Sequence, residues 1–85
     1  MTNDTEAMGV RLLRAFNEEA KGNTDTAVLA AEAARRAGFD YGSEDYEAAL
    51  RYLLDSGHLR PAAIVGGEGF SITSEGVERL TQGEA

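Results

Sequence analysis

The stretch GFDYGSEDYEAALRYLLDSGHL, residues 38–59, indicates a turn followed by an amphipathic helix. Ser43 is one of the residue types that cap helix N-termini. Tyr46 and Leu50 recur at helical spacing with the leucines that follow them. Gly57 comes after the last turn of this pattern, where a left-handed glycine commonly ends a helix. The stretch therefore predicts a helix between Ser43 and Gly57 that buries a leucine-rich face.

Helical and strand patterns continue on both sides of this helix. Val10, Leu13 and Phe16 recur at helical spacing, and two β-capable runs, LRPAAIV and FSIT, flank a Gly-rich turn. Pro61 must lie on an edge or at a strand start, because proline has no N–H to donate to a sheet. The expected elements are, in chain order, a helix over 5–21, a helix over 28–37 preceded by the capping residues 23–26, the helix between 43 and 57, a hairpin over 59–73, and a short helix from 74.

Three motifs in this order resemble the winged-helix family of helix-turn-helix domains. ARRAGF, residues 34–39, resembles the end of the second helix and the turn that follows it. AALRYLLDSGHL, residues 48–59, resembles the recognition helix running into the wing. FSITSEGVERL, residues 70–80, resembles the second wing strand and the Thr-x-x-Gly-x-x-x-Leu start of a closing helix. The resemblance covers about residues 5–80 and is nearest to small single-domain proteins of bacteria and phages.

The resemblance implies a mainly α fold with a small β-hairpin. Its parts would be a three-helix core, a two-stranded wing and a short C-terminal helix. A chain of 85 residues has the usual length of one domain, so we expect a single domain over residues 1–85. Residues 1–4 and 82–85 are expected to be disordered ends.

Composition limits the chemistry that the chain can perform. There is no cysteine, which excludes disulfides and thiolate metal sites, and His58 is the one imidazole. The chain carries no phosphate-loop or calcium-loop pattern, so we expect neither an enzyme nor a cofactor. His58 is expected at the surface, with its protonated form favoured by a helix C-terminus. No apolar run approaches the ~18 residues of a membrane span and no leader opens the chain, so a cytoplasmic protein is expected.

In a DNA-binding winged helix, the third helix enters the major groove and the wing rests on the backbone. The formal net charge here is −7, and acids crowd the first turn of that helix. A carboxylate near a phosphate suffers on the order of a few kcal/mol of repulsion at an effective dielectric of ~20. The same acids also stabilise a helix N-terminus, so they need no ligand to explain them. The candidate surface for a partner or nucleic acid consists of Ser43, Glu44, Asp45, Glu47, Ala48, Arg51, Tyr52, Arg60 and Glu68.

Two functional hypotheses follow. The first is a non-enzymatic protein-interaction or dimerisation module, whose partner carries a basic surface or is a second copy. The alternative is a DNA-binding domain like that of a transcription regulator. Tyr52 either folds over onto the wing or its neighbours, or anchors a protein partner. Arg35 and Arg36 either interact with the helix end or contact phosphate.

A second apolar stripe on the first helix adds a question about self-association. Met8, Leu12 and Ala15 lie beside the first stripe at helical spacing. They form either one side of a wide core face or a face for a homodimer.

Overall fold

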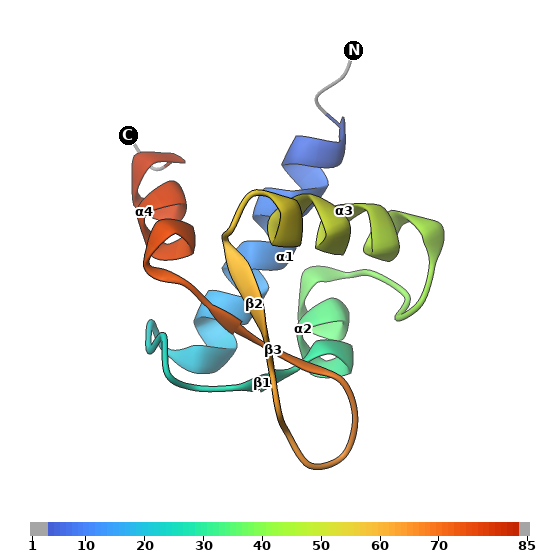
Figure 1. Cartoon of the computed structure of the whole chain (residues 1–85). Coiled ribbons are helices and arrows are strands. Elements are labelled where there is room, and N and C mark those ends of the chain that lie inside the picture. The colour runs from blue at the N-terminus through green and yellow to red at the C-terminus, as the bar shows by residue number, and fades with distance from the viewer. Residues whose placement is uncertain (1–3, 84–85) are drawn as a thin grey trace.

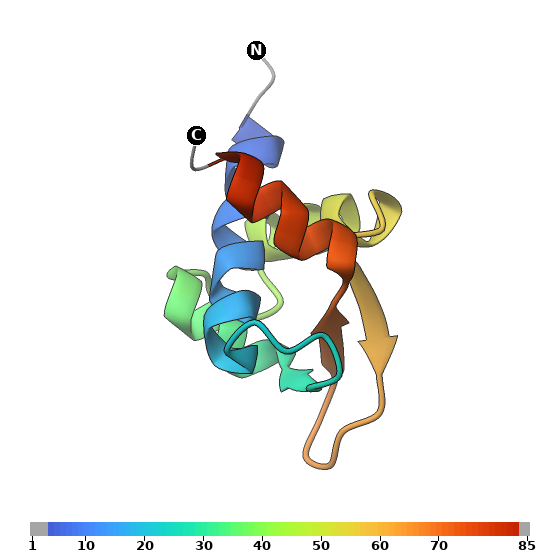
Figure 2. The ribbon, with the colours of Figure 1, turned by 90° about the vertical axis from the view of Figure 1, so that its left-hand side faces the viewer.

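The structure is a computed structural model, and it describes residues 4–83. Within that range the fold consists of four helices and a small antiparallel sheet, whose β2–β3 loop projects away from the helices (Figure 1). In chain order the elements are α1 (Asp4–Ala20), β1 (Val28–Leu29), α2 (Ala30–Ala37), α3 (Glu44–Asp55), β2 (Leu59–Ala62), β3 (Gly69–Ile72) and α4 (Ser74–Gly83). The start of α1 and the end of α4 lie at one end of the molecule, and the β2–β3 loop lies at the other (Figure 1, Figure 2).

The sheet has three strands, in the order β1-β3-β2, where the sequence predicted two. Val28 pairs with Phe70, and the amide of Ala30 donates to the carbonyl of Glu68 at 2.8 Å. Pro61 lies in the edge strand β2, as expected, with Phe70 as its register partner. The third strand was missed because Val28 and Leu29 continue the helical pattern of the alanines that follow, and only β3 gives them a strand partner.

The start of α2 is therefore shifted from residue 28 to residue 30. Leu29 occupies the N-cap position without a side-chain cap among the described residues. The capping residues upstream form a local turn instead, in which Asn23 Oδ1 accepts a hydrogen bond from the amide of Asp25 at 2.8 Å. Ser71, which is buried, donates its hydroxyl to the carbonyl of Thr26 at 3.1 Å and ties this loop to β3.

The core lies around α1, which packs against α2, α3, α4 and β3. Phe16 from α1 meets Phe70 from β3 edge to face, with ring centroids 6.1 Å apart. Ala33 and Ala34 are fully buried, and such small side chains let α2 approach α1 closely. The core is thus made by every helix together with the inner face of the sheet.

The second apolar stripe of α1 belongs to this core. Leu12 is 0% exposed and Ala15 is 3% exposed, and Met8 packs half-buried against the cluster. These side chains are covered within one copy of the chain, because α1 is contacted by neighbours on several sides. The expectation of a dimer face at Met8, Leu12 and Ala15 is therefore wrong, and the wide core face is the correct interpretation.

Helix ends follow the local chemistry of the sequence. Ser43 Oγ accepts from the amide of Tyr46 at 3.2 Å, so Ser43 caps α3 as predicted. Gly57 has φ 78° and its amide donates to the carbonyl of Leu54, while the amide of His58 donates to that of Leu53. These paired bonds are a Schellman motif, which needs a left-handed residue at this position.

The last helix is longer than expected. Thr73 Oγ1 accepts from the amide of Gly76 at 3.1 Å and donates to the carbonyl of Gly57 at 2.6 Å, which caps α4 and ties it to the end of α3. Helix α4 runs to Gly83, and α1 already includes Asp4, so residues 4, 82 and 83 are helical rather than disordered. The other residues of the expected ends, 1–3 and 84–85, lie outside the described range. No helix in that range is long and apolar enough to cross a membrane.

Candidate functional site

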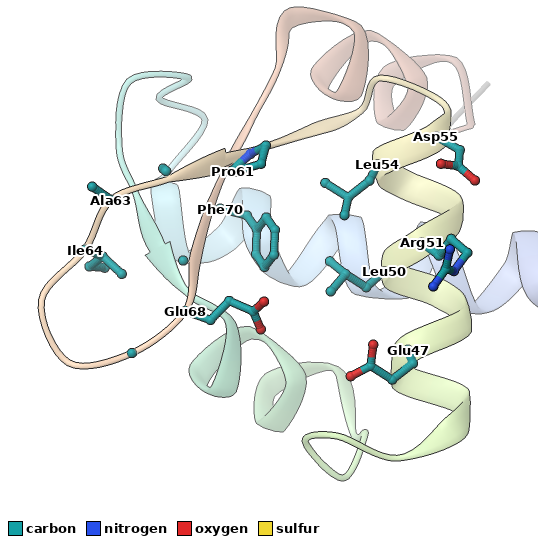
Figure 3. Close-up of a pocket in the computed structure, with 13 residues that line it drawn as sticks. Glu47, Leu50, Arg51, Leu54, Asp55, Pro61, Ala63, Ile64, Glu68 and Phe70 are labelled. Atoms are coloured by element: carbon teal, nitrogen blue, oxygen red, sulfur yellow. The ribbon is translucent and has the colours of Figure 1, made fainter.

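A groove of about 670 Å³ opens between α3 and the β2–β3 hairpin (Figure 3). We call it the α3–hairpin groove. Its residues come from one stripe of the helix and from both arms and the loop of the hairpin. They are Glu47, Leu50, Arg51, Leu54, Asp55, Pro61, Ala62, Ala63, Ile64, Gly67, Glu68, Gly69 and Phe70.

The α3 side of the groove follows from helical periodicity. Residues 47, 50, 51, 54 and 55 recur three and four apart, so they form one stripe along the helix. Leu50 and Phe70 face each other at the bottom, where both are buried (Figure 3). Leu54 and Ile64 are half-buried and Pro61 is exposed, so the walls offer apolar surface to an occupant.

The rim of the groove is acidic. Glu47, Asp55 and Glu68 are exposed carboxylates along its edge, and Arg51 is the one cation among the lining residues of the described chain. Figure 3 shows the carboxylates of Glu47 and Glu68 on opposite sides of the same end of the groove. An apolar trough edged by carboxylates suits an occupant that is apolar in the middle and positively charged at its sides.

Glu68 also holds the hairpin to the turn before α3. The hydroxyl of Tyr41 donates to Glu68 Oε1 at 3.1 Å, which raises the pKa of Tyr41, and its ring lies 5.2 Å from that of Tyr46. The Tyr46 side chain is fully buried, and its hydroxyl has no hydrogen-bond partner among residues 4–83. Burial, followed by the charge of Glu68, raises the pKa of Tyr46 well above its ordinary value of 10.0. Tyr46 therefore stays a neutral phenol beneath this end of the groove.

Some of the surface residues predicted from the sequence line the groove, and others do not. Glu47, Arg51 and Glu68 line the groove. Ser43 and Ala48 are half-buried, and Glu44 and Asp45 are exposed on the first turn of α3 outside the groove lining.

Tyr52 and Arg60 lie away from the groove. A Cβ on Gly9 would lie 2.5 Å from Tyr52 Cδ2, so the half-buried Tyr52 ring packs against α1. Arg60 pairs in register with Ser71 and donates to the carbonyl of Thr24 at 3.2 Å, so it faces the loop before β1. Successive side chains of a strand point to opposite faces, which separates Arg60 from Pro61.

Sequence reasoning missed the apolar half of the groove. The sequence predicts Leu50 and Phe70 as core residues, and Pro61, Ala63 and Ile64 as strand or turn residues. The available signal was the uncharged run PAAIV in a segment that resembles a wing, where a DNA-binding protein would carry cations. Whether this run lies opposite the leucines of α3 depends on the register of β2 and β3.

Arg35 and Arg36, the two predicted phosphate contacts, have partners within the chain, as does Arg79 of α4. Arg36 pairs with Glu19 and Glu18, and these hydrogen bonds and charges raise its pKa. Arg35 pairs with Glu32, and Arg79 pairs with Glu6. The guanidinium of Arg11 lies 4.4 Å from the centroid of the Phe39 ring.

His58 differs from its expectation. It is half-buried between the end of α3 and β2, and its Nδ1 is buried with no hydrogen-bond partner in the described range. Burial and the nearby charge of Arg79 lower the pKa of His58 below 6.5, against an opposing effect of Glu75. The neutral ring is therefore favoured, whereas the sequence suggested a protonated surface histidine. Residues 4–83 contain no group of three side chains of the kind that ligates metals.

Comparisons with protein-family models, with curated proteins and with solved structures found no match to this chain.

Proposed function

We propose that this protein is a non-enzymatic protein-interaction module on a winged-helix scaffold, with the β2–β3 hairpin as the wing. The order of three helices, hairpin and closing helix supports this assignment of the fold. So do the Ser43 cap before α3 and the Thr73 cap before α4. Strand β1 pairing with β3 extends the wing to a three-stranded sheet without changing that order.

The charge of the α3 face is the observation that carries the proposal. Glu44, Asp45 and Glu47 are exposed on the first turn of α3, the part of a recognition helix that meets DNA. Duplex binding draws much of its affinity from Lys or Arg side chains that neutralise phosphates. On this face Arg51 is outnumbered by carboxylates. A protein partner with a basic surface fits the same face without that repulsion.

The loop of the hairpin supports the same conclusion. Val65 is 96% exposed at the loop, and its neighbours from Ala62 to Gly67 carry no charge. An exposed apolar side chain beside an apolar groove favours contact with protein over contact with a phosphate backbone.

DNA binding is the second candidate, and one observation favours it. A shallow hollow of about 230 Å³ between α1 and α2 is lined by Arg11, Arg14 and Arg36 together with Glu18. A duplex against this hollow would meet several guanidinium groups. Arg36 would first have to leave Glu18 and Glu19.

Titration of a labelled random duplex tests the proposal at ~20 mM salt, where electrostatic affinity is greatest. We expect no binding at protein concentrations of tens of micromolar, which are on the order of the dissociation constants of non-specific DNA binding. A triple variant, Glu44→Lys with Asp45→Lys and Glu47→Lys, should gain salt-sensitive binding and serves as a positive control for the placement of α3. Tight, salt-sensitive binding by the unmodified protein would contradict the proposal.

A further inference from the structure

We propose that the α3–hairpin groove binds one amphipathic α-helix of a partner protein, with Lys or Arg on both sides of its apolar face. This inference rests on the proposed function, because it names the occupant of the same face.

The groove has the dimensions of a short helical segment. Its α3 residues run from Glu47 to Asp55, which at ~1.5 Å per residue is about 12 Å, or two turns of a helix. The opposite wall is the hairpin, where Pro61 and Phe70 lie across from Leu50 and Leu54 (Figure 3). Apolar residues at two successive turns of a helix could therefore both reach the walls of the groove.

An extended peptide fits this place less well. Strand addition needs a run of free backbone N–H and C=O groups on an edge strand. The edge strand here, β2, has four residues, and Pro61 in it has no N–H to offer. A helix satisfies its own backbone hydrogen bonds and needs from the groove only apolar contact and charge.

Charge selects a basic partner over a second copy of this chain. Glu47, Asp55 and Glu68 border the groove with Arg51 as the cation among them. In a symmetric dimer that buried this groove, the acidic rim of one copy would face the acidic rim of the other. The whole chain has a formal net charge of −7, which adds to this repulsion. Lys or Arg on an incoming helix turns the repulsion into attraction.

A designed peptide tests the inference. The probe is a fluorescein-labelled helix of about 18 residues with leucines at i, i+3, i+4 and i+7 and lysines beside them. We expect saturable binding by fluorescence anisotropy. Amide shifts in nuclear magnetic resonance spectra should be confined to α3 residues 47–55 and hairpin residues 61–70. A peptide with its leucines scrambled around the helix, and one with lysines replaced by glutamates, should both fail to bind.

Two matched pairs of variants locate the contact. Glu47→Lys in the groove should weaken binding by roughly fivefold or more, and Asp45→Lys on the same turn by less than about twofold. The two substitutions change the net charge equally and both remove an acid from the start of α3. Ala63→Arg should weaken binding more than Val65→Arg, since Ala63 lines the groove and Val65 does not.

The outcomes separate this inference from the proposed function. Absence of amide shifts at ~1 mM peptide, a concentration that detects even millimolar affinity, would overturn the helical occupant. Equal binding of the scrambled peptide, or shifts on α1 and α2, would do the same. Concentration-dependent shifts at the groove without peptide would assign it to a second copy. The duplex titration decides the proposed function independently of all these results.

Discussion

Tyr46 and Tyr41 are neighbouring tyrosines in opposite surroundings. The Tyr46 hydroxyl is buried with no partner among the described residues, whereas that of Tyr41 donates to Glu68 at a half-exposed position. A buried unsatisfied hydroxyl costs free energy, so we expect Tyr46→Phe to raise the free energy of unfolding by about 1 kcal/mol. Tyr41→Phe, which loses a hydrogen bond, is the matched control and should lower it slightly. Urea unfolding measures both, and a destabilised Tyr46→Phe would show that the hydroxyl has a partner.

The pH dependence of the free energy of unfolding gives a second test of Tyr46→Phe. Because burial raises the pKa of Tyr46 in the folded protein, ionisation near pH 10.0 is easier in the unfolded chain. The contribution of the protonated Tyr46 phenol to stability is therefore complete below pH 10.0 and is lost as pH rises above that value. The fall in the free energy of unfolding above pH 10.0 should be smaller in Tyr46→Phe than in the unmodified protein.

His58 titrates in the opposite sense. Burial and then Arg79 lower its pKa in the folded state, so protonation is easier in the unfolded chain. Its contribution to stability is complete above pH 6.5 and is lost as pH falls below that value toward the folded pKa. A magnetic resonance titration of the His58 ring should give a pKa below 6.5, and Arg79→Gln should raise it, while Arg35→Gln should not. A pKa at or above 6.5 would mean that the ring is solvated.

At the scale of elements, the contact between α4 and the end of α3 depends on a glycine. A Cβ on Gly76 would lie 2.5 Å from the carbonyl oxygen of His58 and 2.9 Å from Ile72 Cγ1. Alanine favours a helix by about 1 kcal/mol, but backbone atoms at this distance cannot move aside cheaply. Gly76→Ala should therefore lower the free energy of unfolding by about 1–3 kcal/mol, measured by urea unfolding.

Glu78→Ala is the control for this prediction, since Glu78 is exposed on the same helix. It should change the free energy of unfolding by no more than about 0.5 kcal/mol. A Gly76→Ala variant as stable as the unmodified protein would mean that α4 does not dock on the turn after α3.

The same scale shows which elements were predictable. Ser43 and Gly57 set the limits of α3 through bonds to amides and carbonyls a few residues away, so their roles could be inferred from the chain. Val28 and Leu29 could not be assigned in the same way. Their pairing with Phe70 and Gly69 spans about forty residues of sequence, and two residues are too few to show the alternation of a strand.

In the molecule as a whole, the excess of acidic residues lowers stability through charge repulsion. The radius of gyration is 11.5 Å and the net charge is −7, so at a Debye length of ~30 Å in 10 mM salt the charges act on one another across the whole chain. The exposed ion pairs contribute little, about 0–1 kcal/mol each. We therefore expect Tm to rise by a few degrees when salt is raised from about 10 to 150 mM. That shift corresponds to a gain of about 1 kcal/mol in the free energy of unfolding.

Asp45→Lys provides the control, because it changes the net charge from −7 to about −5 and removes none of the ion pairs described above. Its Tm should depend less on salt than that of the unmodified protein. A Tm that falls as salt is added would show that the ion pairs outweigh the repulsion.

Features that depend on neighbours along the chain follow from the sequence alone. These are the periodic faces of the helices, the cap at Ser43, the turn at Gly57 and the acidity of α3. Helical period and capping act over three or four residues, so they can be inferred before any tertiary contact is known.

Which faces are covered and which remain open follows only from the tertiary structure. It buried Leu12 and Ala15, set Tyr52 against Gly9, turned Arg60 toward Thr24 and brought Leu50 opposite Phe70 across a groove. A periodic pattern fixes which residues share a face, whereas the exposure of that face depends on what packs against it. That in turn depends on contacts between elements far apart in the chain, such as α1 with α3 and β3 with β1 and β2.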